Sequence, residues 1–289
     1  MLWAAAVALA TALTFHEGMR YELLSDWDDV TFVVNNPHIA LGWKNFFFYL
    51  CHPFQDLFSP LPMWSLMVDR ALWGPNPLGY HLHNLLLHIL AAWALMAVLR
   101  KLGVRQALAG LGTLLWALNP QKVESVIWVS ERKDVLCGLF AFLSVWLFLE
   151  RRWGWCACCT ILAIFAKPAA LALPGVYVAL AWGRGEPLLR REVMVPVAVG
   201  MCAVIWSMAV TKQTNPGTME TALIVPLHNL FWYPLTALVP FETNPFYPES
   251  IELDTRCLAV LAAGMALLVA GIALFVIFAA KRRRHNAED

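Results

Sequence analysis

Three carboxylates stand together near the start of the chain, in the run Asp26-Trp27-Asp28-Asp29, soon after an apolar N-terminal segment. A charge beside a lipid bilayer is costly, so a carboxylate pair at a membrane boundary is a functional-site hypothesis. Asp28 and Asp29 are therefore the first candidates for chemistry. The alternative is that they belong to a solvated acidic loop.

A second polar group stands at the start of a predicted membrane helix. His81, Asn84 and His88 follow one another at intervals of three and four residues, so they share one helix face. Polar side chains inside a membrane face protein or water rather than lipid. The stripe either serves a site or only hydrogen-bonds neighbouring helices, and the sequence leaves both readings open.

A third group is basic and lies between two predicted spans, in residues 120–134. The loop contains Lys122, Arg132 and Lys133 beside Glu124, Glu131 and Asp134. Outer loops of membrane proteins tend to lack Lys and Arg, so these cations suggest an anionic ligand such as a lipid phosphate. Pairing with the acidic residues of the same loop is the alternative.

The elements that position these residues are membrane helices. Sixty per cent of the 289 residues are hydrophobic, only 14% are charged, and the mean hydropathy is +0.60. This composition excludes an ordinary soluble domain and predicts an all-α, polytopic membrane protein in one domain, 1–289. A net charge of +1 gives no support to a nucleic-acid partner. Apolar runs predict eight spans, at about 2–15, 80–99, 107–119, 135–149, 154–166, 168–183, 193–210 and 257–280.

Basic clusters set the orientation of these spans. With eight helices, Arg100-Lys101, Arg151-Arg152, Arg190-Arg191 and the basic tail 281–289 all fall on the cytoplasmic side, as the positive-inside rule requires. Both termini are then cytoplasmic. The segment 154–183 is predicted to be a hairpin of two short helices rather than one kinked helix, because the hairpin moves Lys167 to the outer surface. Pro168 then begins the second helix, where its missing N–H does no harm.

This topology leaves three external segments, 16–79, 120–134 and 211–255, which must build any outer site. Two stretches in them, 63–73 and 227–238, are predicted to be interfacial helices because they combine apolar residues with Trp or Tyr. Short spans rich in Ala and Trp favour a bacterial inner membrane.

Motifs along residues 20–250 resemble the GT-C superfamily of membrane glycosyltransferases, most closely the transmembrane and tetratricopeptide-repeat-containing O-mannosyltransferases. The matching pieces are Trp27-Asp28-Asp29, Asn35-Asn36-Pro37, Ala71-Leu72-Trp73-Gly74, Gly79-Tyr80-His81-Leu82-His83-Asn84, Asn119-Pro120, Val123-Glu124-Ser125-Val126, Trp128-Val129-Ser130-Glu131-Arg132-Lys133-Asp134, Lys167 and Asn244-Pro245-Phe246-Tyr247-Pro248. The resemblance implies an inverting transfer of a sugar from a polyprenyl-phosphate carrier to a hydroxyl acceptor at the outer membrane face.

The resemblance also assigns roles to residues. Asp28 would be the general base, with Asp29 second, and Arg132, Lys133 and Lys167 would stabilise the leaving phosphate. His81 and Asn84 would orient the base or the sugar, and Glu124 would hold the basic loop. Some members bind a divalent ion, and Asp28, Asp29 and His81 could ligate one, although no spacing demands it. The implied partners are membrane lipids, the carrier lipid and other membrane subunits.

The chain departs from the family pattern at several polar positions. Ser59-Pro60 stands where a Tyr-Arg-Pro is usual, Asn119 and Lys122 replace two histidines, and Pro168 replaces an acid. The repeats are also absent, as expected for a truncated member. A non-catalytic GT-C-like scaffold subunit of a larger complex is therefore an alternative function. No internal repeat or pair of broken helices favours a transporter.

Overall fold

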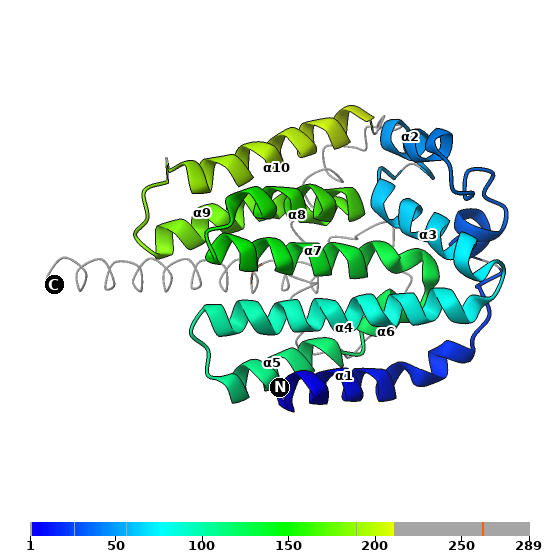
Figure 1. Cartoon of the computed structure of the whole chain (residues 1–289), viewed down its shortest axis with the longest axis horizontal. Coiled ribbons are helices and arrows are strands. Elements are labelled where there is room, and N and C mark those ends of the chain that lie inside the picture. The colour runs from blue at the N-terminus through cyan, green and yellow to red at the C-terminus, as the bar shows by residue number, and fades with distance from the viewer. Residues whose placement is uncertain (1, 26, 56, 189, 211–261, 263–289) are drawn as a thin grey trace, which may run out of the picture. The chain divides into compact units, whose positions relative to one another are not determined.

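A computed structural model describes residues 2–25, 27–55, 57–188, 190–210 and 262 (Figure 1). By its internal contacts the chain divides into two units, residues 1–179 with 188–212, and residues 180–187 with 213–289. The architecture and site described below belong to the first unit, apart from residues 180–183 at the end of one helix. Its described residues form helices joined by turns, apart from one isolated β-bridge between Phe54 and Leu57. The predicted all-α class is therefore confirmed for this part of the chain.

The elements follow one another with short connections. In chain order they are α1 Leu2–Phe15, η1 His16–Arg20, η2 Val30–Val34, α2 Trp43–Cys51, α3 Pro60–Trp73, α4 Pro77–Lys101, α5 Gln106–Ala117, α6 Lys122–Ile127, η3 Val129–Glu131, α7 Arg132–Leu149, α8 Trp153–Ala166, η4 Pro168–Ala172, α9 Leu173–Gly183 and α10 Arg191–Val210. The η elements are short 3₁₀ turns, except η2, which is a single π-helical turn.

Helices occupy every predicted span that falls in the described residues. Two helices there, Leu2–Arg20 and Pro77–Lys101, are long and apolar enough to cross a membrane. They support a membrane location, whereas the count of eight spans stays a prediction. The eighth predicted span, the predicted outer segment 211–255 with its interfacial helix, and the tail 281–289 lie outside the described residues.

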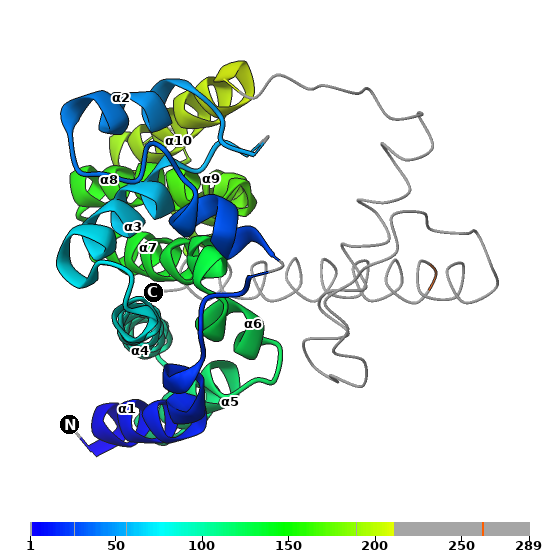
Figure 2. The same ribbon diagram turned by 90° about the vertical axis from the view of Figure 1, so that its right-hand side faces the viewer.

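Helix α4 is the centre of the arrangement. It packs against α1 and α5 on one side and against α7 on the other, while α7 packs on α8 and α8 packs on α10 (Figures 1 and 2). Local sequence explains where α4 begins. Pro77 occupies its first turn, where no backbone donor is needed, and the Asn76 side chain caps the helix by accepting from the Leu78 N–H at 3.1 Å.

The chain reverses direction at Lys167. Helix α8 ends at Ala166, and Pro168 begins η4, which leads into α9. The Tyr177 hydroxyl lies 2.6 Å from the Thr160 hydroxyl, so α9 returns alongside α8. This is a hairpin and not one kinked helix. At the other end of the helices, Lys101 forms a salt bridge with Glu150 at 2.8 Å, which joins the ends of α4 and α7.

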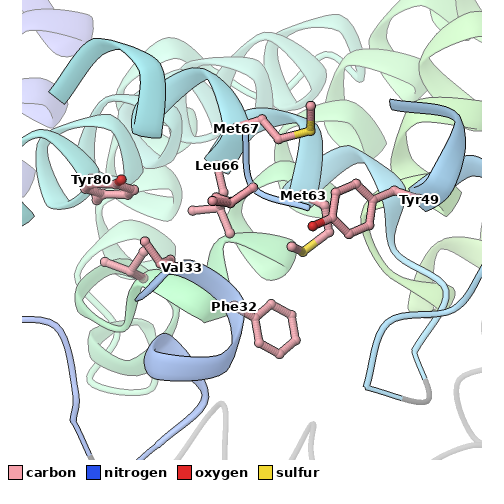
Figure 3. Close-up of a cluster of buried hydrophobic side chains, with 9 residues drawn as sticks. Phe32, Val33, Tyr49, Met63, Leu66, Met67 and Tyr80 are labelled. Atoms are coloured by element: carbon pink, nitrogen blue, oxygen red, sulfur yellow. The ribbon is translucent and has the colours of Figure 1, made fainter. Parts of the chain in front are cut away.

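A buried apolar cluster joins the predicted external segment 16–79 to the start of α4. Figure 3 shows its side chains converging from η2, α2, α3 and α4. The labelled members are Phe32, Val33, Tyr49, Met63, Leu66, Met67 and Tyr80. Each large side chain removed from water in such a cluster contributes about 1.5–3 kcal/mol. The segment is thus folded onto the helices, which gives its polar residues fixed positions.

Candidate functional site

Asp28 and Asp29 are neighbours in sequence with different environments. Asp28 is exposed, whereas the Asp29 side chain is 1% exposed. The Asp29 carboxylate accepts hydrogen bonds from the Ser130 N–H at 2.8 Å, from the Ser130 hydroxyl, and from the Leu24 N–H at 3.1 Å. Asp29 therefore anchors the loop, and Asp28 beside it is the exposed carboxylate of the pair.

The Asp29–Ser130 contact joins residues 101 positions apart in the sequence. Asp29 directly precedes η2, where Phe32 and Val33 are buried in the apolar cluster, so its position is fixed from both sides. Ser130 stands two residues before Arg132. The acidic segment and the basic loop therefore meet at one end of the helices.

Arg132 is the first residue of α7 and is completely buried. Its guanidinium donates to the Asn84 side-chain oxygen at 2.6 Å, the Tyr80 carbonyl at 2.9 Å and the Ser65 hydroxyl at 3.0 Å. It also forms an ion pair with Asp69. A buried charge is tolerated only with partners of this kind, and here they tie together α3, α4 and α7.

The buried Asp69 and the partly exposed His83 complete this network, and neither was predicted as a site residue. The second Asp69 oxygen lies 2.6 Å from His83 Nδ1, and Asp69 is 1% exposed. The sequence did carry a signal, because Asp69 follows Leu66 by three residues and so falls on the buried face of α3. A carboxylate on a buried face requires a cationic partner.

The predicted polar stripe of α4 faces protein along its length. His81 donates through Nε2 to the Tyr21 carbonyl at 3.1 Å, and Asn84 donates to the Trp128 carbonyl at 3.4 Å. One turn further on, His88 donates to the Ala117 carbonyl at 3.0 Å. The first two contacts hold the backbones of the two segments that are predicted to be external, 16–79 and 120–134, against the start of α4.

The two lysines of the predicted phosphate site are paired within the chain and remain partly accessible. Lys133 forms a salt bridge with Glu131 at 2.6 Å, and its side chain is 12% exposed. Lys167 pairs with Asp134 and is 35% exposed. Arg132, by contrast, is 0% exposed. The three cations are brought together at one end of α7, but they differ in what they can contact.

Two further charged residues of the loop 120–134 have pKa values that are shifted by their surroundings. Burial lowers the pKa of Lys122, with Asp134 and Lys167 as its charged neighbours. Partial burial and the neighbouring carboxylates Glu131 and Asp134 raise the pKa of Glu124 on α6. Lys133 and Lys167 pair with Glu131 and Asp134 instead, which belong to the turn before α7 and to the start of α7. Within the described ranges, no three His, Cys, Asp or Glu side chains are grouped as metal ligands.

Comparison with known proteins gives similarity to one group of relatives. The mouse protein O-mannosyl-transferase TMTC1 is 32% identical over 155 residues, which cover 49% of this chain and 16% of the relative. The Drosophila melanogaster protein O-mannosyl-transferase Tmtc1 is 36% identical over 117 residues, which cover 39% of this chain and 13% of the relative. The human protein O-mannosyl-transferase TMTC2 is 32% identical over 139 residues, which cover 42% of this chain and 16% of the relative.

These matches confirm the resemblance to the O-mannosyltransferase family over somewhat less than half of the chain, and the match spans about a sixth of each relative. No protein-family model matches the chain, and no solved structure matches it significantly.

Proposed function

We propose that this chain is a GT-C-type glycosyltransferase that moves a sugar from a polyprenyl-phosphate carrier to a hydroxyl acceptor at the outer membrane face. The activity named for its relatives supports this class of reaction. The observation that carries the proposal is the Asp29–Ser130 contact, which holds the exposed Asp28 next to the loop that contains the cations. An acid beside cations is the arrangement that transfer from a lipid phosphate requires.

Asp28 acts as the general base. It takes the proton of the acceptor hydroxyl while that oxygen attacks the anomeric carbon, and the bond from that carbon to the phosphate oxygen breaks. Attack opposite the leaving group inverts the anomeric centre. Asp29 is a positioning residue, because its two oxygens are already occupied by Leu24 and Ser130.

The phosphate gains negative charge as it leaves and needs a cation close by. Lys133 and Lys167 are partly exposed and supply this charge. Arg132 acts indirectly. It is buried in an ion pair with Asp69 and fixes the position of the start of α7. His81 and Asn84 hold the Tyr21 and Trp128 backbones in register. Glu124 completes the charge balance of the loop.

The proposed site lies on the outer side of the membrane, with both chain termini in the cytoplasm. The end of α4 and the end of α7 carry the basic pairs Arg100-Lys101 and Arg151-Arg152, and the Lys101–Glu150 salt bridge joins them. Under the positive-inside rule this end is cytoplasmic, so Asp28 and Lys167 are external. We assign the protein to a bacterial inner membrane on the composition of its spans.

The purified chain should transfer mannose from a polyprenyl-phosphate donor to a hydroxyl acceptor, and Asp28→Asn should lower this rate by about 10²- to 10⁴-fold, the usual contribution of a general base. Because Asp28 is exposed, the variant should keep the thermal stability of the wild type. Glu22→Gln, an exposed acid in the same segment, is the matched control and should leave the rate unchanged. Equal rates in wild type and Asp28→Asn would rule out this base.

A second candidate is a non-catalytic scaffold subunit of a membrane complex. The internal pairing of Arg132, Lys133 and Lys167 with carboxylates favours it, because a scaffold needs packing and not a free cation. Native mass spectrometry separates the two functions. Stoichiometric protein subunits without transfer activity indicate the scaffold, and a bound polyprenyl phosphate with activity indicates the enzyme.

A further inference from the structure

Lys122 lies in the same corner as Lys167 and Asp134. Lys122 and Ser125 are three residues apart in α6 and therefore share one face of that helix. The Ser125 hydroxyl donates to one Asp134 oxygen at 3.2 Å, and the other Asp134 oxygen pairs with Lys167. Two lysines from different segments thus flank one carboxylate.

The surroundings of Lys122 fix the position of its ammonium group but do not neutralise its charge. The Lys122 nitrogen is 5.2 Å from the centre of the Trp116 ring, and the side chain is half-buried. In the part of the chain that the structure describes, the salt bridges of this loop join Lys133 to Glu131 and Lys167 to Asp134, and Lys122 forms none. Lys122 is therefore the lysine of this loop whose charge is not offset by a salt bridge within the described residues.

A half-buried ammonium group with no carboxylate partner is costly to the fold. An apolar residue of similar length would fill the same space at less cost. The charge is understandable if an anion enters this corner and offsets it. Glu124 is two residues from Lys122 and so does not share its helix face.

We propose that Lys122 and Lys167 form a subsite for a phosphate group. The Asp134 carboxylate pairs with Lys167 until the phosphate takes its place. Two lysine ammonium groups fit an anionic phosphate, such as the phosphodiester of a sugar phosphate joined to a polyprenyl chain. This deepens the proposed function, on which the identity of the lipid rests. The subsite also gives the cations different roles. Lys122 and Lys167 contact the phosphate, whereas Arg132 links α3, α4 and α7.

Binding, and not transfer, is the first measurement. The full chain in nanodiscs of neutral lipid is titrated separately with a short-chain polyprenyl phosphate and with inorganic phosphate. Lys122→Met and Lys167→Met should each weaken binding of the polyprenyl phosphate by about tenfold or more, the value of one charge-assisted hydrogen bond. The matched control is Lys44→Met, which changes an exposed lysine of α2 and should not alter the affinity.

Asp134→Asn should have the opposite effect. It removes the anion that competes for Lys167, while its amide oxygen can still accept from Ser125, so affinity should rise several-fold. Lys122→Met should also keep or raise the melting temperature, because burial lowers the pKa of Lys122 and the folded state disfavours its charge. Weaker binding without lower stability is the behaviour of a binding residue and not of a structural one.

Unchanged affinity in Lys122→Met would overturn the subsite, and so would a wild type that binds neither form of phosphate. Dependence on Lys122 for inorganic phosphate alone would support the anion subsite and assign it to free phosphate instead of the carrier lipid. Transfer activity of the wild type is measured separately. An active enzyme whose Lys122→Met variant binds normally would refute this inference and leave the proposed function intact.

Discussion

At the scale of single residues, the strongest constraint on this fold is the buried pair of Arg132 and Asp69. Their side chains are 0% and 1% exposed, and Arg132 also donates to the Ser65 hydroxyl of α3 and to the Tyr80 carbonyl of α4. Removing two charges from water costs several kcal/mol per ion, so the pair is stable only while both partners are present. The pair specifies one arrangement of three helices.

Asp69→Ala should destabilise the protein by about 3–5 kcal/mol, because Arg132 would be left buried without a counter-charge. The double variant Asp69→Leu/Arg132→Met should recover at least half of this loss, since it removes both charges together. Chemical denaturation of the detergent-solubilised protein measures both. If the double variant loses as much stability as the sum of the two single changes, the charges are not coupled.

The sequence identified the types of residue at the site better than it identified their partners. Asp29, His81, Asn84 and Arg132 were singled out because charge and polarity are unusual beside a bilayer, and all four lie at one end of the helices. Their partners come from distant segments, and nothing in local composition connects Asp29 with Ser130. Pairing across such separations depends on tertiary packing, which hydropathy does not encode.

At the scale of elements, hydropathy predicted the long helices well because each needs a continuous apolar run. It did not predict α2, whose aromatic residues serve packing inside the external segment. Phe46 of α2 stacks on Trp64 of α3 with ring centres 4.2 Å apart. A short helix of this kind is stabilised by its contacts and not by its own periodicity, so the sequence pattern alone was insufficient.

Close contact between α1 and α5 depends on Gly110. A Cβ atom at this position would overlap the Trp3 ring, and small residues are what allow membrane helices to approach closely. Gly110→Ala should therefore lower stability by about 1–3 kcal/mol through overpacking. Gly112→Ala, in the same helix, is the control, because the nearest atom to its new methyl group is 3.7 Å away, in Leu99. Equal melting temperatures for the two variants would contradict the contact.

At the scale of the molecule, the first unit carries charged groups at both ends of its helices. Asp28, Arg132 and Lys167 lie where α7 begins, and the Lys101–Glu150 salt bridge lies where α7 ends. Helix α4 runs between these ends and is about 37 Å long at 1.5 Å per residue. This exceeds the roughly 30 Å of a hydrocarbon core, so one end can face each side of a membrane.

The orientation is tested by single cysteines in a cysteine-free variant. A membrane-impermeant maleimide should label Glu22→Cys in intact spheroplasts, and should label Arg105→Cys only after permeabilisation, because both positions are exposed and lie toward opposite ends of α4. The reversed pattern would put Asp28 and Lys167 in the cytoplasm and exclude a site at the outer face. Labelling of both cysteines from outside would mean that α4 does not cross the membrane, which would remove the geometric basis for transfer from a carrier lipid.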